Sequence, residues 1–360
     1  MPLCQLLCLY QRSIESKQYF AGTKKRHPLQ SVSHLKKWLN YVAGPLLFIA
    51  IAFSIYKQLS SQQDLAQHWQ QLVQNIREHG TVPLICIVLL MLLNWSIEAL
   101  KWQQLVNHLM PIGWWKALLG VLAGVSFTML TPNRMGEFLG RVLYLPDGSR
   151  MKAATLTAMS SMSQLIITMT AGIMGILYWY SSNVLPADGE QLLMRILLFG
   201  TLLACIAVLL LYFNAGWMVR WMEKWPAAMK YAPIVHAVGE INRFELLKIL
   251  GLAALRYIVF LIQYVLVFMA LQLPIHWLDA IAATAILFLI LAVVPSISLA
   301  ELGIRGKVSL LVFGWYCQQA VGILLAAAVI WFINIILPAL AGSLILLGVK
   351  LFGKNTFEKA

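Results

Sequence analysis

Charged residues are scarce in this sequence. Only 11% of its 360 residues are Asp, Glu, Lys or Arg, and 60% are hydrophobic, whereas a soluble domain carries about a quarter charged residues. Apolar runs of roughly 20 residues, the length of a helix that crosses the hydrocarbon core, recur along the chain. The period-two alternation typical of barrel strands is lacking, which excludes an outer-membrane barrel. We therefore predict an all-α polytopic membrane protein.

Motifs for metals, redox chemistry and nucleotides are also lacking. The five cysteines form no CxxC pair and the histidines no HxxxH or HExxH spacing, so neither a redox nor a metal site is indicated. No GxxxxGK[ST] loop is present, so ATP is not expected as the direct energy source, and we expect no cofactor. The net charge of +13 gathers at the termini and in some loops, which favours a membrane protein over a nucleic-acid binder.

Six spans are predicted, with both ends of the chain in the cytoplasm. Lys24 and Lys25 precede the first apolar run and Lys350 and Lys354 follow the last, and such bases gather on the cytoplasmic side. Residues 60–80 are predicted to form an amphipathic interfacial helix. The spans are about Leu39–Leu59, Thr81–Leu100, Ala153–Tyr180, Leu192–Phe213, Ile249–Leu271 and Gly322–Leu347. The chain is thus divided into a basic tail expected to be mobile (1–35), a transmembrane domain (36–350) and a cytoplasmic tail (351–360).

A proline interrupts the apolar stretch TMLTPNRMGEFLGRVLYL, residues 128–145. An apolar arm, Trp115–Leu130, precedes the break at Thr131-Pro132-Asn133, and a shorter arm, Gly136–Leu145, follows it. If the first arm crossed the membrane, the bases after it would lie outside, against the positive-inside rule. We therefore predict a re-entrant hairpin that enters from the cytoplasm and returns to it. Its GxxxG spacings are expected to be close-packing faces.

A second broken segment, residues 280–316, has apolar arms on both sides of Pro295–Ser298. Because the last span must end in the cytoplasm, this segment is predicted to be a hairpin that enters from the opposite face. Both segments carry Glu-x-x-x-Arg after the break, Glu137 with Arg141 and Glu301 with Arg305, and residues at this spacing share a helical face. Two such hairpins suggest an inverted repeat, from which transporters build midplane sites.

Side chains near the two breaks form a candidate anion site. Thr131 can cap a helix and the run from Ser298 to Glu301 matches a capping box, so each hairpin is expected to direct a helix N-terminus towards the bilayer centre. The alternative is that the Glu–Arg pairs only fix the hairpins in place; we favour function because ionisable groups at membrane depth are costly. Glu98 with Lys101 is expected to be a plain interfacial pair. The candidate substrate-binding residues are Thr131, Asn133, Arg134, Glu137, Arg141, Ser298, Glu301, Arg305 and Lys307, with Arg256 as a further candidate.

Three segments carry a family resemblance. TPNRMGEFLGR (131–141) resembles the T-P-G-R-x-G-E motif of the flippase-like family related to the transmembrane domain of lysylphosphatidylglycerol synthase. PSISLAELGIRGK (295–307) is similar to that family's P-x-x-x-G-G-x-G-x-R-E segment, and IILPALAGSLILL (335–347) to its last helix. The resemblance covers about residues 39–350, and the chain departs from the motifs at Asn133, Ala300, Glu301 and Gly306. Carried over by position, it implicates Thr131, Pro132, Arg134, Gly136, Glu137, Pro295, Gly303 and Arg305.

The resemblance implies translocation of a lipid or export of a lipid-linked precursor. We hypothesise an inner-membrane flippase or scramblase, not an enzyme, in which the arginines hold the phosphate of an anionic or zwitterionic headgroup and the glutamates reset the site. Bifunctional members of the family carry a soluble aminoacyl-transferase domain after the membrane part, which this sequence lacks, so no synthase activity is expected. An intramembrane lipid-modifying transferase and a non-catalytic partner in envelope biogenesis are the alternatives. The oligomeric state is not indicated.

Overall fold

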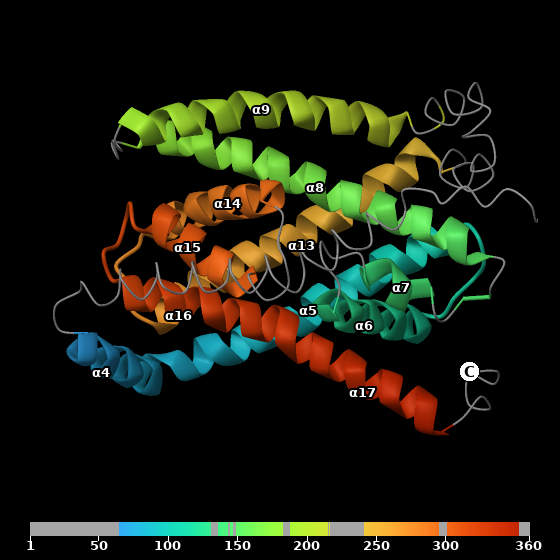
Figure 1. Ribbon diagram of the computed structural model, residues 1–360, viewed down its shortest axis with the longest axis horizontal. Helices are drawn as coiled ribbons and strands as arrows, with labels where there is room; N and C mark the ends of the chain where they lie inside the picture. The colour runs from blue at the N-terminus through green and yellow to red at the C-terminus, as the bar shows by residue number, and fades with distance from the viewer. Residues whose placement is uncertain are drawn as a thin grey trace, which may run out of the picture. The chain divides into compact units, whose positions relative to one another are not determined.

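The computed structural model describes residues 65–130, 136–142, 145–146, 149–182, 188–214, 216, 241–294 and 301–352, and in this part of the chain it is helical and contains no strand. Among the described residues, five helical segments are long and apolar enough to cross a membrane, which confirms a polytopic all-α membrane protein. They lie roughly side by side along the long axis in Figure 1. The predicted first span, about Leu39–Leu59, and the basic tail lie outside the described residues.

The five crossing segments match the five later predicted spans. They are α5 (Thr81–Val106), α8 (Arg150–Ser181), α9 (Asp188–Phe213), α13 (Arg243–Ala270), and α16 (Ala320–Trp331) continued through the π-helical turn η5 (Phe332–Ile336) into α17 (Leu337–Phe352). The helix predicted over residues 60–80 is present in part as α4 (Leu65–Asn75), and its interfacial position stays a prediction. It is joined to α5 through a second π-helical turn, η2 (Ile76–Gly80), so α4 and α5 form one uninterrupted helical run.

Contacts between helix ends show that α5 and α13 run in opposite directions. His108, just after α5, lies 2.7 Å from Glu245 at the start of α13, and Asn75 before α5 donates to the carbonyl of Leu271 after α13. We call the end with His108 and Glu245 the basic end, because Arg150, Lys152 and Arg243 lie in the first turns of helices that begin there and Lys248 follows in the second turn of α13. The other end, where α13 finishes, is the opposite end.

The first predicted hairpin is formed by α6 (Trp114–Leu130) and α7 (Gly136–Val142). It begins and ends at the basic end: Gln103 of α5 donates to the carbonyl of Ile112 before α6, and the Ser149 hydroxyl contacts Met110. The two arms touch through backbone, since a Cβ atom on Gly140 would lie 2.1 Å from the nitrogen of Gly124. The predicted close-packing role of these glycines is therefore confirmed.

The second hairpin, α14 (Trp277–Val293) and α15 (Glu301–Phe313), begins and ends at the opposite end. The Tyr178 hydroxyl at the end of α8 donates to Asp279 in the first turn of α14, and Gly322 at the start of α16 lies against Leu273 after α13. Gly172 and other small residues of α8 allow α14 to pack closely on it. The two hairpins therefore enter the bundle from opposite ends, as the charge pattern predicts.

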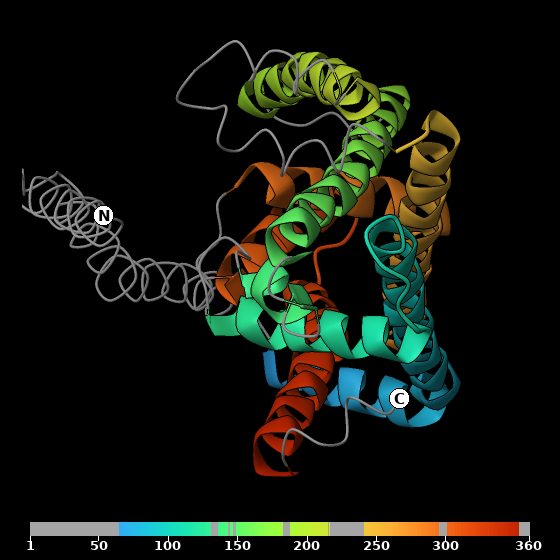
Figure 2. The ribbon, with the colours of Figure 1, turned by 90° about the vertical axis from the view of Figure 1, so that its right-hand side faces the viewer.

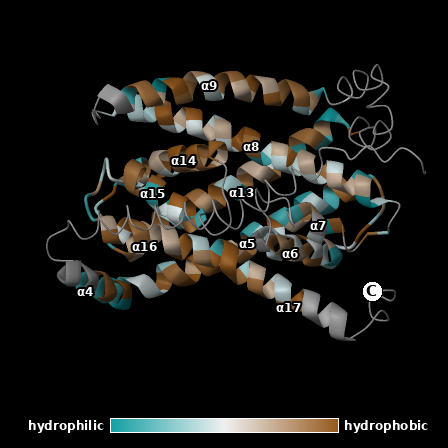
Figure 3. Cartoon of the chain, viewed as in Figure 1, coloured by the Kyte–Doolittle hydropathy of each residue, from teal (hydrophilic) through white to brown (hydrophobic). Residues whose placement is uncertain are grey.

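The larger buried apolar cluster packs around the second hairpin. Phe268 of α13 lies 4.8 Å from Phe313 of α15, and Tyr264 stacks on Phe313 at 6.0 Å between ring centroids. A smaller buried cluster around Trp102 and Leu156 joins α5, α6 and α8. Helix α9 packs on α8 at the periphery (Figure 2) and is largely apolar along its length (Figure 3), with exposed residues such as Phe199 and Leu203. Such an exposed apolar surface is what a lipid-facing helix requires.

Candidate functional site: a buried charged cluster

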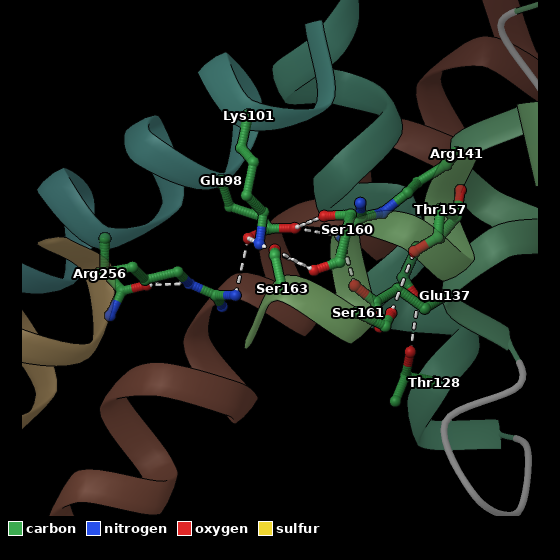
Figure 4. Close-up of polar contacts among 12 residues, drawn as sticks. Glu98, Lys101, Thr128, Glu137, Arg141, Thr157, Ser160, Ser161, Ser163 and Arg256 are labelled. Atoms are coloured by element: carbon green, nitrogen blue, oxygen red, sulfur yellow. Dashed lines mark hydrogen bonds and ion pairs between the residues drawn. The ribbon is translucent and has the colours of Figure 1, made fainter. Parts of the chain in front are cut away.

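Polar residues on one face of α5 begin the site. Asn94, Glu98 and Lys101 follow one another at spacings of four and three, so they share a helical face. They are 0%, 1% and 1% exposed. The rest of α5 is mostly apolar, and this polar face points into the bundle, towards side chains of α7, α8 and α13 (Figure 4).

The Glu98 carboxylate is the common partner of three bases. Its oxygens lie 2.9 Å from Lys101 Nζ, 2.7 Å from Arg141 Nη2 and 2.7 Å from Arg256 Nη1. The Ser160 hydroxyl of α8 donates a longer hydrogen bond of 3.4 Å to the same carboxylate. A carboxylate has about four lone-pair sites, so the acceptor capacity of Glu98 is fully used.

Arg141 is held at the centre of the cluster from the short helix α7. Its Nη2 donates to Glu98 and also to Glu137, one turn earlier on α7, and its guanidinium lies 5.3 Å from the Trp102 ring. Arg141 is 1% exposed, whereas the Glu137 side chain is 29% exposed. The Nε and Nη1 atoms of Arg141 are buried without a hydrogen-bond partner in the described part of the chain.

Arg256 completes the cluster from α13. Its Nε donates to Asn94 Oδ1 at 2.5 Å and its Nη1 to Glu98. The guanidinium also lies over the rings of Trp95 and Phe260, at 5.1 and 5.6 Å. At 14% exposure its side chain is the most accessible base of the cluster.

The cluster carries more positive than negative charge. Three cations, Lys101, Arg141 and Arg256, face two carboxylates, Glu98 and Glu137, which leaves a formal charge of +1. Buried charges are stable only when paired and hydrogen-bonded. The surplus charge and the unpartnered guanidinium atoms therefore suit a small anion.

The family model for the lysylphosphatidylglycerol synthase transmembrane region matches residues 41–342. The chain belongs to this family. The predicted family membership is thus confirmed over most of the chain. A comparison with curated protein sequences finds no match.

In the structure, the predicted site residues fall into three groups. Glu137, Arg141 and Arg256 are brought together around Glu98. Glu301 and Arg305 form a second pair on α15, with Arg305 Nη2 3.6 Å from Glu301 Oε1; Lys307 lies two positions further on. Thr131, Asn133, Arg134 and Ser298 lie outside the described residues.

The two Glu–Arg pairs have different surroundings. Arg141 contacts two carboxylates, those of Glu137 and Glu98. Arg305 has one carboxylate partner among the described residues, that of Glu301. Arg305 Nε and the hydroxyl of Ser309, one turn later, are buried and have no hydrogen-bond partner within the described ranges. No hydrogen bond or ion pair between described residues joins Arg305 to Arg141. Whether the two arginines act in one site stays a prediction.

The interpretation of Glu98 and Lys101 as an interfacial pair is wrong. Helix α5 continues to Val106, beyond the predicted end of the span at Leu100, so both residues lie within the helix and are buried. The signal was present in the sequence, because Asn94 and Glu98 are polar residues one turn apart in an otherwise apolar run. What the sequence did not contain is the identity of their partners, which come from α7 and α13.

Proposed function

We propose that the protein moves a phosphate-bearing lipid, or a lipid-linked precursor, between the leaflets of the inner membrane as a flippase or scramblase. The observation that carries this proposal is the cluster of three bases and two carboxylates around Glu98, buried inside a membrane bundle. Ionisable groups at such depth are expensive and are usually functional. A headgroup phosphate would bind Arg141 and Arg256 while the acyl chains stay in lipid.

The arrangement of the hairpins supports a transport role. One hairpin enters the bundle from each end, so each half of the bundle has a broken helix near its interior. Broken helices from opposite sides are the building plan of many secondary transporters. The bases at the starts of α8 and α13 support a cytoplasmic position for the basic end under the positive-inside rule, and the C-terminal helix α17 would then end on the same side. Movement would be driven by a proton gradient or by simple equilibration.

The test is transbilayer movement of headgroup-labelled phospholipid in reconstituted vesicles. We expect Arg141→Ala to abolish movement, because the phosphate loses its most buried cation. Arg77→Ala, which removes a base from the exposed turn before α5, serves as the matched control and should move lipid like the unmodified protein. If a folded Arg141→Ala variant moves the labelled phospholipid at the normal rate, the cluster is not the transport site.

The two alternative functions predict different results. If the protein is a non-catalytic partner in envelope biogenesis and the cluster is purely structural, changing both Glu137 and Arg141 to Gln, which keeps the net charge, should leave its function intact. An intramembrane transferase would produce a covalently altered lipid when the purified protein is incubated with labelled phospholipid. A flippase loses movement in the first experiment and yields no new product in the second.

A further inference from the structure

The two carboxylates of the cluster differ in how firmly they are held. Glu98 is 1% exposed and is bound by three cations and a serine hydroxyl. Glu137 is 29% exposed and, within the described residues, contacts a single cation, Arg141. It also stands on a helix of only seven residues. Glu98 is therefore a permanent member of the cluster, and Glu137 is the carboxylate that can leave it.

Arg141 still has donors to offer. Its Nη2 is shared between Glu98 and Glu137, while Nε and Nη1 are buried with no hydrogen-bond partner in the described ranges. An unpaired buried donor is costly, and guanidinium groups bind phosphate best through two parallel donors. An oxyanion with two free oxygens would use this guanidinium more fully than Glu137 does.

The net charge of the cluster limits which ligands can bind there. Without a ligand, the cluster contains three cations and two carboxylates. If one singly charged anion replaces Glu137, and Glu137 turns towards its exposed side, the buried charge does not change. A neutral ligand in the same place would leave the cations under-compensated, which is costly in the interior.

We propose that Glu137 is an internal stand-in for the substrate, and that the singly charged phosphodiester of a lipid headgroup takes its place on Arg141. This inference rests on the proposed function and defines the ligand of the same site. Binding and displacement of Glu137 are one exchange. When no headgroup is bound, Arg141 stays paired with Glu137.

The first test measures binding of short-chain phosphatidylglycerol to the detergent-purified protein. Removing the competitor with Glu137→Gln should tighten the Kd about tenfold. Glu78→Gln removes an equally charged but exposed carboxylate before α5 and should leave the Kd unchanged. Short-chain diacylglycerol, which lacks the phosphodiester, should not bind. An unchanged or weaker Kd for Glu137→Gln overturns the inference, and so does equal binding of inorganic phosphate and the lipid.

A second measurement uses the unmodified protein, in case Glu137→Gln does not fold. Carbodiimide modifies accessible carboxylates, and the rate at Glu137 is read by peptide mass spectrometry. Phosphatidylglycerol should raise that rate several-fold, because the carboxylate is displaced outwards; protection by the lipid would contradict the exchange. If Glu137 fails both tests while Arg141→Ala still abolishes lipid movement, only this inference falls. If Arg141→Ala moves lipid normally, the proposed function falls first.

Discussion

At the scale of single residues, the structure depends on one acid. Glu98 lies between bases from its own helix, from α7 and from α13, and its two oxygens accept from all three. Without this carboxylate, Lys101, Arg141 and Arg256 would be buried together, and of the cluster's carboxylates only the partly exposed Glu137 would remain to balance them. Glu98 is thus both a structural centre and the group that keeps the bases oriented.

We predict that Glu98→Gln lowers the free energy of unfolding by about 3–5 kcal/mol, the cost of leaving a buried charge without its partner. Chemical denaturation in detergent micelles measures this, and the exposed Glu78→Gln should change stability by less than about 0.5 kcal/mol. Adding Arg256→Gln should cost less in the Glu98→Gln background than alone, since the two residues are in contact. Strictly additive effects would mean that the pair does not stabilise the protein.

The sequence revealed the local half of this cluster and not the distant half. Glu137 and Arg141 are four positions apart, so helix geometry alone predicts their contact. Glu98 is 43 positions away from Arg141, and Arg256 is 158 positions away from Glu98. Contacts at such separation depend on how the helices pack, which periodicity and charge rules do not specify.

At the scale of elements, the α6–α7 hairpin depends on the absence of side chains. The carbonyl oxygen of Glu137 would lie 2.6 Å from a Cβ atom on Gly124, and a Cβ atom on Gly140 would meet the backbone of α6. Backbone atoms cannot turn aside as a flexible side chain can. This close contact holds α7, and with it Arg141, against α6.

We predict that Gly140→Ala destabilises the protein by about 3 kcal/mol, because α6 and α7 must separate to admit the methyl group. The midpoint of thermal unfolding reports this change. Gly251→Ala in α13 is the matched control: nothing lies within 4 Å of its Cβ position, and alanine is the better helix former by about 1 kcal/mol. A Gly140→Ala variant as stable as Gly251→Ala would show that the arms are not in contact.

The ends of α5 and α13 are joined by an ion pair that depends on pH. His108 Nε2 faces Glu245, and its Nδ1 faces the backbone carbonyls of Gln104 and Leu105, so both ring nitrogens meet acceptors. Partial burial opposes the charged ring, but the hydrogen bond and charge of Glu245 outweigh it and raise the pKa of His108 above its usual value. A cleft of about 440 Å³, which Lys248 also lines, opens beside this pair.

We therefore predict that stability falls as pH rises through the raised pKa of His108. A group whose pKa is raised by folding stabilises the protein fully below its unfolded pKa of about 6.5 and loses that contribution above the folded value. Because the pair is partly exposed, the loss should be no more than about 1 kcal/mol. Unfolding midpoints between pH 6 and 9 measure it, and His108→Gln should flatten the profile. A profile of unchanged slope in that variant would exclude the pair as its cause.

At the scale of the whole molecule, the charge pattern and the length of the apolar runs predicted most of the architecture. The five spans and two hairpins of the described residues, with a sixth predicted span outside them, follow from where bases occur and where Pro132 and Pro295 interrupt apolar runs in the sequence. The continuity of α4 with α5 was not predictable in this way. The two helices are joined by a π-helical turn at Ile76–Gly80, and neither charge nor apolar length indicates such a turn. The predicted inverted repeat also does not extend to the chemistry of the two Glu–Arg pairs. Arg141 has the second carboxylate Glu98, and no such acid from another helix contacts Arg305 among the described residues.

Mass spectrometry of the lipids that co-purify with the protein tests the central claim most directly. The unmodified protein should retain a lipid that contains a phosphodiester, and Arg141→Gln should lose it, because we propose that the buried Arg141 guanidinium beside Glu98 binds the headgroup. Arg305→Gln, compared in parallel, reports whether α15 contributes to the same site. Retention of the same phospholipid at the same occupancy by folded Arg141→Gln protein would contradict a headgroup site at this cluster.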